Sequence, residues 1–317
     1  KRRTFSLEVL PDNWSLMLNC IRYGYIIFLS ALLFISSCAR ENKTRIHFWH
    51  VMGGPIGKQL EQMIQEFNEL HPEAEIKSVQ MGSYDALAQK LMGAIASNST
   101  PTIAQMYESW TDQFYKAGFL EPLQTFVDTD TAFDLHDFFP VFIEDNTFES
   151  VLVTLPFNKS LPVFYYNITI FDSAGINHFP ENWTEFRIAC ERLRKLSIWP
   201  TSWPIDVWYF GSMLYQEGGE LFNQNTKKPM FQNEAGVRVL EYIVNLVKDS
   251  LLYLNPGFQR QDEFLSGNVA TIPASIVSWA FLKGRPRFEM KVAPFPQGNY
   301  KGIVIAGTNI GMFKNAS

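Results

Sequence analysis

The sequence predicts an α/β fold with a parallel sheet, and three observations lead to this prediction. The first is the order of its segments, because short strands and amphipathic helices follow one another between residues 45 and 108. The second is the spacing of apolar residues, which alternate in the predicted strands and recur at helical intervals between them. The third is composition, since 317 residues of which 46% are hydrophobic and 19% charged are typical of a globular protein with a sizeable core.

The first half of the chain supplies three strands and two helices in strict alternation. They are strand 45–49, helix 56–70, strand 74–82, helix 83–97 and strand 101–108. His71-Pro72 ends the first helix, since the residue before a proline is disfavoured in helical conformation. Ser83 is the expected N-cap of the second helix. In such an order the strands pair in parallel, and ligands bind at their carboxyl ends.

The second half begins after a change in composition at residues 156–162 (PFNKSLP), where two prolines bracket polar residues and predict a crossover. Beyond it we expect helices 181–196 and 233–249, a strand after Gly267, and strands 291–298 and 302–313. Asn182 or Thr184 is the expected N-cap of the first of these helices. A second α/β unit is therefore predicted.

Charge and side-chain chemistry exclude several classes of protein. The net charge is −5, and the Lys and Arg residues are scattered, so no basic stripe for nucleic acid exists. The five His residues are dispersed, with no HExxH motif and no paired CxxC motif, so we expect no metal and no cofactor. Cys190, in a helical segment, is expected to be a small buried apolar residue.

The N-terminal residues have the pattern of an export segment. Residues 25–37 form an uncharged run of about signal-peptide length, too short for the roughly 20 residues of a membrane-spanning helix. The following Cys38, in ISSC, resembles the lipidation site of exported bacterial lipoproteins. We expect residues 1–16 to be an upstream extension, residues 17–37 to be the signal peptide, and Cys38 to carry the lipid. The alternative is an uncleaved N-terminal anchor.

A glycine-rich turn before helix 56–70 has the look of a phosphate-binding loop. A P-loop needs glycine five residues before Gly57 and a hydroxyl residue after Lys58, but the sequence has Met52 and Gln59. The GxGxxG pattern does not occur either. These glycines are therefore interpreted as a tight turn that opens a helix.

Several motifs together resemble those of a known family. They are FWHVMGG, EFNELHP, PTIAQMYE, FNKSLPVFYYN and NVATIPAS. The chain is similar to the extracellular solute-binding proteins (family 1) of bacterial ABC importers, which include lipoproteins that bind maltodextrins and other sugars. The combination of FWHVMGG with Tyr84, Glu108 and Ser160 resembles the branch that binds sn-glycerol 3-phosphate.

The resemblance implies a two-lobe, periplasmic-binding-protein-like α/β fold with parallel-rich sheets joined by hinge crossovers. Residues 38–159 would form the first part of lobe 1, residues 160–275 lobe 2, and residues 276–317 a return to lobe 1 that ends near a third hinge. Members of the family usually continue beyond this point. Lobe 2 is therefore expected to be incomplete, without an arginine that the family uses near its C-terminus.

The resemblance also implies a set of ligand-binding residues. They are Tyr84, Glu108, Ser160, Trp203, Ser275 and Gly307. An ionised carboxylate such as Glu108 accepts hydrogen bonds from hydroxyls, Ser160 and Ser275 can donate to phosphate or sugar oxygens, and Trp203 would offer an apolar face. Ser278 could replace Ser275, and Asp206 could stand where the family has a second tryptophan. Lys159 is expected to be a solvated hinge residue.

The function that this implies is capture of a small solute for delivery to an ABC permease, without catalysis. The solute is expected to be sn-glycerol 3-phosphate or a related phosphodiester, and a neutral sugar is the alternative. The protein is expected to be exported and lipid-anchored, in the periplasm or at the cell surface. Two other classes stay open: a secreted glycoside hydrolase with Glu108 and Asp112 or Asp206 as its carboxylates, and a lipoprotein that binds a partner and not a solute.

Overall fold

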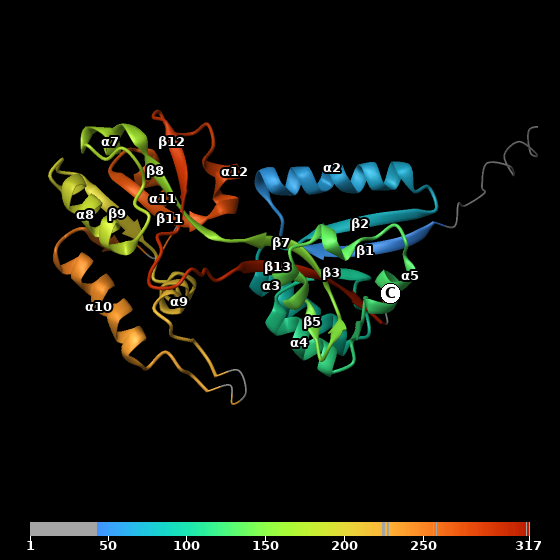
Figure 1. Ribbon diagram of the computed structural model, residues 1–317. Coiled ribbons are helices and arrows are strands. Elements are labelled where there is room, and N and C mark those ends of the chain that lie inside the picture. Colours follow the sequence, from blue (N-terminus) through green and yellow to red (C-terminus); the bar gives the residue numbers. More distant parts are fainter. Residues whose placement is uncertain are drawn as a thin grey trace, which may run out of the picture.

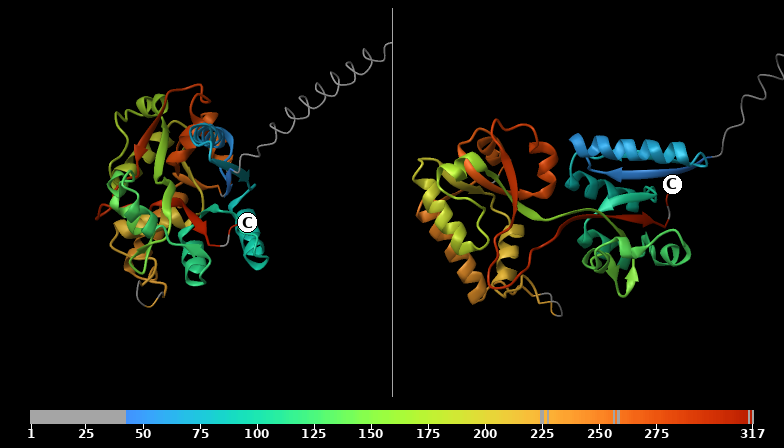
Figure 2. Two further views of the ribbon diagram at one scale, coloured as in Figure 1. Left: turned by 90° about the vertical axis from the view of Figure 1, so that its right-hand side faces the viewer. Right: turned by 45° about the horizontal axis from the view of Figure 1, so that its top comes forward.

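The computed structural model describes residues 43–314 and 316, except residues 224, 225, 227, 256 and 258. Within this part of the chain there are two main sheets, of six and five strands. Each is packed with helices into a separate body, and extended segments join the two (Figures 1 and 2). We call the body around the six-stranded sheet lobe 1 and the other lobe 2. The two-lobe α/β prediction is thus confirmed.

Lobe 1 contains most of the elements before residue 161 and the last strand of the chain. Its elements are β1 (Thr44–His50), α2 (Gly54–Leu70), β2 (Ala74–Gln80), α3 (Tyr84–Ala96), β3 (Ile103–Met106), α4 (Glu108–Lys116), β4 (Leu120–Glu121), α5 (Gln124–Thr129), η2 (Leu135–Asp137), α6 (Pro140–Glu144), β5 (Thr147–Phe148), β6 (Val151–Leu152), β7 (Leu155–Ser160) and β13 (Ala306–Phe313). The five elements predicted between residues 45 and 108 are all present.

The sheet of lobe 1 is mixed and not wholly parallel. Strands β2, β1 and β3 pair in parallel, as expected, but β13 pairs antiparallel with β3, β4 and β7. Leu60 and Ile64 of α2 pack on Phe48 at one face of the sheet. Leu87 and Leu91 of α3 pack with Ala104 and Met106 at the other. The three parallel strands therefore end at one edge with helices on both faces.

The glycines before α2 form a tight turn that opens the helix, as the sequence predicted. Gly54 has φ +58°, a left-handed conformation that favours glycine. The backbone N–H of Gly57 donates to the carbonyl of Gly53 at 3.1 Å, which closes the first turn of the helix. A Cβ at Gly57 would lie 2.8 Å from the carbonyl oxygen of Met52. The glycines let the chain turn sharply against itself.

Lobe 2 is a second α/β unit. Its elements are β8 (Pro162–Asn167), α7 (Ile168–Ser173), α8 (Trp183–Arg194), β9 (Trp199–Trp203), α9 (Val207–Gln216), α10 (Glu234–Lys248), β10 (Leu252–Leu254), α11 (Gln259–Leu265), β11 (Val269–Ser275), η3 (Ile276–Ser278), α12 (Trp279–Leu282) and β12 (Met290–Pro294). Strands β10, β9 and β11 are parallel, while β8 lies antiparallel between β11 and β12. Asn182, and not Thr184, caps α8.

The return to lobe 1 comes later in the chain than expected. Residues 276–317 were assigned to lobe 1, but β12 pairs with β8 from Met290 to Pro294, inside the sheet of lobe 2. Only β13 joins the sheet of lobe 1. The boundary at residue 276 is therefore corrected to lie between Pro294 and Ala306. The alternation that predicts a strand does not say which sheet the strand will join.

Two extended segments connect the lobes side by side. The first is the step from β7 to β8, and the second leads into β13, which pairs with β7 (Figures 1 and 2). Ala306 is opposite Ser160, and Gly307 is opposite Lys159. The crossover predicted at residues 156–162 is confirmed. No helix in the described part of the chain is long and apolar enough to cross a membrane.

Candidate functional site: the cleft between the lobes

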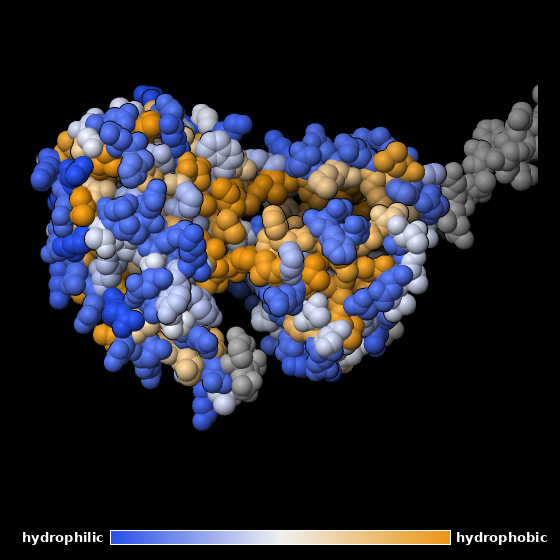
Figure 3. Space-filling view, viewed as in Figure 1, coloured by the Kyte–Doolittle hydropathy of each residue, from blue (hydrophilic) through white to orange (hydrophobic). Residues whose placement is uncertain are grey.

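The two lobes meet where one strand of each sheet ends. Ser160 ends β7 of lobe 1, Ser275 ends β11 of lobe 2, and their hydroxyl oxygens lie 2.5 Å apart. Tyr165 donates its hydroxyl to the carbonyl of Ser275 at 3.0 Å, which fixes the end of β11. Figure 3 shows a notch between the two lobes, with apolar residues on both lobes where they approach each other. Two of the predicted site residues therefore meet across the lobes.

A buried glutamine connects other parts of the cleft. The side-chain amide of Gln105, at the end of β3, donates to the Tyr84 hydroxyl at 3.3 Å and to Asn158 Oδ1 at 3.2 Å. The same amide lies 2.7 Å from Thr308 Oγ1 in β13, and its carbonyl accepts from the backbone of Val51 at 2.8 Å. Gln105 is fully buried. It thus holds the predicted ligand residue Tyr84 against both crossover strands, and the sequence alone did not reveal this role.

Glu108, the first residue of α4, faces the same region. It is half-buried, and its Oε1 accepts from Lys159 Nζ at 2.6 Å and from Asn309 Nδ2 at 3.4 Å. Burial raises the pKa of Glu108, and the hydrogen bond from Lys159 opposes that rise. The carboxylate is thus anchored from behind while part of it stays accessible. Such a group can accept hydrogen bonds from the hydroxyls of a polyol.

Lys159 is not the solvated hinge residue that we expected. Its side chain is only 4% exposed, and its Nζ pairs with Glu108 at 2.6 Å and with Asp145 at 2.5 Å. The reason is geometric, because β7, which pairs with β13 in lobe 1, passes close to the start of α4 and the end of α6. This cluster of one cation and two carboxylates gives the wall of lobe 1 a net negative charge.

Gly307 was predicted to contact the ligand through its backbone, but at the hinge its missing side chain has a reason within the fold. Its φ is +125°, and an added Cβ would lie 2.2 Å from the Asn158 carbonyl oxygen and 2.7 Å from Lys159 Cα. The β7–β13 pairing changes register one residue later, between Thr308 and Asn309. Glycine is needed here for the close approach of the two crossover strands, independently of any ligand.

Trp203 does not present its ring to the cleft, which corrects the role predicted for it. The residue is 2% exposed, and its ring packs with those of Phe164, Trp183 and Phe186. Its indole N–H donates to Thr201 Oγ1 at 2.8 Å. Residues two apart in a strand lie on the same face, and in β9 this face is covered by α8. Trp203 is a core residue of lobe 2.

The carboxylates that a hydrolase would need are held elsewhere. Asp112 pairs with Lys116 one turn along α4, at 2.8 Å. Asp206 accepts from the backbone N–H of Trp208 at 2.8 Å and caps α9. Glu108 and Asp112 are four residues apart on α4 and so lie on one side of the same helix, whereas a glycoside hydrolase needs two carboxylates that face each other across the substrate.

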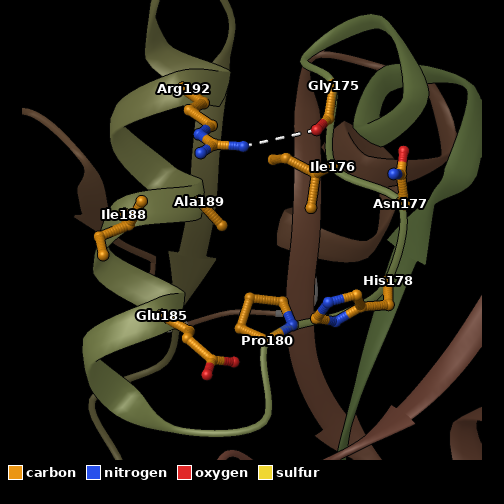
Figure 4. Close-up of a pocket in the computed structure, with 9 residues that line it drawn as sticks. All are labelled: Gly175, Ile176, Asn177, His178, Pro180, Glu185, Ile188, Ala189 and Arg192. Atoms are coloured by element: carbon orange, nitrogen blue, oxygen red, sulfur yellow. Dashed lines mark hydrogen bonds between the residues drawn. The ribbon is translucent and has the colours of Figure 1, made fainter.

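Other cavities of lobe 2 lie outside the cleft. One of about 400 Å³ lies between α8 and the loop after α7, where Arg192 donates to the carbonyl of Gly175 (Figure 4). Glu185 lines this cavity, and its carboxylate accepts hydrogen bonds from the backbone of Glu181 and the side chain of Asn182. Glu185 therefore stabilises the first turn of α8. A second, strongly apolar groove of about 520 Å³ runs between α9, α10 and β10. Neither is lined by lobe 1.

Metal and thiol chemistry has no support in the described residues. They contain no cluster of three or more potential metal ligands from His, Cys, Asp and Glu. Cys190 is 1% exposed in the core of lobe 2, as predicted, and burial raises the pKa of its thiol. Cys38 lies outside the residues that the structure describes.

Comparison with known sequences identifies related proteins. The profile of a family described as bacterial extracellular solute-binding protein matches residues 53–317. The sn-glycerol-3-phosphate-binding periplasmic protein UgpB of Yersinia pestis is 26% identical over 269 residues, which are 80% of this chain and 61% of that protein. UgpB of Salmonella typhimurium is 25% identical over 286 residues, 84% of this chain and 65% of the relative. The chain thus spans about three fifths of these relatives.

Comparison with solved structures shows the same two-lobe fold. UgpB from Mycobacterium tuberculosis in complex with glycerophosphocholine superposes with a TM-score of 0.78 at 22% identity, over 87% of this chain and 74% of the other. The GacH receptor of Streptomyces glaucescens, solved unliganded and with acarbose, gives a TM-score of 0.75 at 24% identity, over 87% and 72%.

Proposed function

This chain belongs to the family of bacterial extracellular solute-binding proteins, and from that premise we propose that it captures a small polar solute between its lobes for an ABC importer. The proposed role is binding and delivery to the permease, without catalysis. The proposed ligand-contacting residues are Tyr84, Glu108, Ser160 and Ser275. Trp203 is excluded because its ring is buried in the core.

One observation carries this proposal. Residues from distant parts of the chain converge where the two lobes meet, and the 2.5 Å contact between Ser160 and Ser275 joins one wall to the other. Tyr84 is connected to this hinge through Gln105 and Asn158, and Glu108 is connected to it through Lys159. A solute placed here would touch both lobes, so its binding would favour a closed arrangement over an open one.

We propose sn-glycerol 3-phosphate, or a phosphodiester that contains it, as the solute. The UgpB relatives support this choice, and the polar groups of the cleft suit a short polyol. Glu108 supplies an acceptor for hydroxyls, while Ser160 and Ser275 supply donors for phosphate oxygens. A neutral sugar is the second candidate, since the structurally similar GacH receptor was solved with acarbose.

Calorimetric titration distinguishes these solutes. We expect sn-glycerol 3-phosphate to bind at least tenfold more tightly than maltose, a difference of about 1.4 kcal/mol or more. Tighter binding of maltose would move the assignment to neutral sugars within the same family. No heat with either solute, for a protein that melts cooperatively, would contradict solute capture in the cleft.

Export and lipid anchoring at Cys38 form a separate proposal that rests on the sequence motif. Labelled palmitate should be incorporated into the protein in bacterial cells, and the Cys38→Ala variant should lose the label. Incorporation that persists in this variant would contradict lipidation at Cys38 and leave the cleft proposal untouched.

A further inference from the structure

Lobe 2 contains a buried cation that the site described above does not use. Arg260, in the first turn of α11, is 8% exposed. Its Nη1 donates to the carbonyl of Gly257 at 2.5 Å, but its Nε is buried without a hydrogen-bond partner. Within the described part of the chain, no carboxylate lies close enough to Arg260 to form an ion pair.

The position of this arginine is set by the topology of lobe 2. The parallel strands β9, β10 and β11 end at one edge of the sheet, and the Ser160–Ser275 contact shows that this edge faces lobe 1. Arg260 lies just after β10. Its neighbour Gln261 approaches Ser278 at 3.5 Å, which brings the start of α11 to the segment that follows Ser275.

Arg260 belongs to a helix on one face of the sheet and interacts with a residue of the opposite face. Helix α11 packs on one face through Phe264, whereas Tyr209 of α9 belongs to the core on the opposite face. Burial raises the pKa of Tyr209 to about 12, and the charge of Arg260 together with a hydrogen bond from its side chain opposes that rise. A side chain that begins on one face and reaches a residue of the other must cross the ends of the strands.

A buried guanidinium without an anionic partner is unfavourable for the protein alone. Arginine stays charged, and charges taken out of water are normally paired. Its planar fork suits phosphate, which it can hold through two parallel hydrogen bonds. Asp206, the acidic residue after β9, is exposed and is already used to cap α9. The buried Nε of Arg260 therefore has hydrogen-bonding capacity that no residue described in the structure uses.

We infer that Arg260 holds the anionic phosphate group of the solute, while Glu108 and Tyr84 on the opposite wall hold its hydroxyl groups. This inference rests on the proposed function of solute capture and adds the orientation of the ligand to it. This orientation agrees with the charges on the two lobes, since the phosphate would lie toward the cation and the hydroxyls toward the carboxylates. The cluster of Glu108, Asp145 and Lys159 in lobe 1 holds two carboxylates and one cation, whereas Arg260 in lobe 2 has no carboxylate partner among the described residues.

The test compares three arginine variants by calorimetry with sn-glycerol 3-phosphate. Arg260→Met should lose about 100-fold or more in affinity, and Arg260→Lys about tenfold, because lysine keeps the charge without the fork. Arg238→Met is the matched control, since Arg238 is half exposed and pairs with Glu217 on the surface. Its affinity should equal that of the wild type.

The melting temperature without ligand separates binding from a structural role. Removal of an unpaired buried charge should leave the Arg260→Met variant as stable as the wild type or more so. Wild-type affinity in Arg260→Met would overturn the inference and leave solute capture standing. If Arg260→Met does not fold, unchanged affinity in Arg260→Lys overturns it equally. Failure of the wild type to bind sn-glycerol 3-phosphate would contradict both this inference and the choice of solute.

Discussion

Replacing Gly307 by alanine is expected to destabilise the protein by at least about 3 kcal/mol, the upper end of the cost of a strained backbone. At φ +125° the new Cβ would lie 2.2 Å from the Asn158 carbonyl oxygen and 2.7 Å from Lys159 Cα. These are backbone atoms of the paired crossover strand and cannot rotate away. Strands β7 and β13 would have to separate at the hinge, and solute binding should be lost as well.

Gly302→Ala is the matched control for this change. Gly302 lies in the same connecting segment and is exposed, and a Cβ added there would meet no heavy atom within 4 Å beyond its chain neighbours. Its free energy of unfolding, measured with urea, should stay within about 0.5 kcal/mol of the wild type. Equal stability of the two alanine variants would show that the hinge does not require glycine at position 307.

Lys159→Met is expected to lower the free energy of unfolding by about 2 kcal/mol at pH 8. Loss of one partner from a fully buried ion pair costs about 3–5 kcal/mol. The expected loss is smaller here because the Glu108 and Asp145 side chains are 33% and 42% exposed, so water screens part of the repulsion. The variant should also bind solute more weakly, since Glu108 loses the group that orients it.

The loss of unfolding free energy in Lys159→Met should be larger at high pH than at low pH. Without the ammonium group, the pKa of Glu108 rises further above its ordinary value, and protonation of the carboxylates relieves their repulsion. The difference from the wild type should therefore be largest at pH 8 and shrink toward pH 4. Lys116→Met, which breaks an exposed pair with Asp112, should show no such trend. A loss that is equal at both pH values would contradict the proposed pairing.

Much of the fold could be predicted because local rules decide it. Helical spacing and the stop at His71-Pro72 gave α2 its C-terminal end, and Ser83 caps α3 by accepting from the backbone of Ala86. The sheet that a strand joins could not be predicted in the same way. Strand β12 pairs with β8, more than one hundred residues earlier in the chain. Its alternating pattern would suit either sheet, so only the packed structure assigns it.

Site residues that belong to a family motif could be predicted from the sequence. Residues whose role depends on whether their side chain is buried could not. Glu108, Ser160 and Ser275 came from the family resemblance. Ser160 and Ser275 meet where the lobes join, and Glu108 pairs with the neighbouring Lys159. Trp203 came from the same source, but packing turns its ring into the core. Arg260 carries no motif at all. Its one clue in the sequence is its position beyond a parallel strand, since α/β proteins commonly bind ligands at the carboxyl ends of such strands.

Amide hydrogen exchange with and without saturating sn-glycerol 3-phosphate tests whether the solute binds between the lobes. We expect slower exchange on both walls at once, around Tyr84 and Glu108 in lobe 1 and around Ser275 in lobe 2, and in the crossover at Ser160. Both walls should respond because the solute would hold them together. Protection confined to one lobe, or to the apolar groove between α9 and α10, would contradict binding in the cleft.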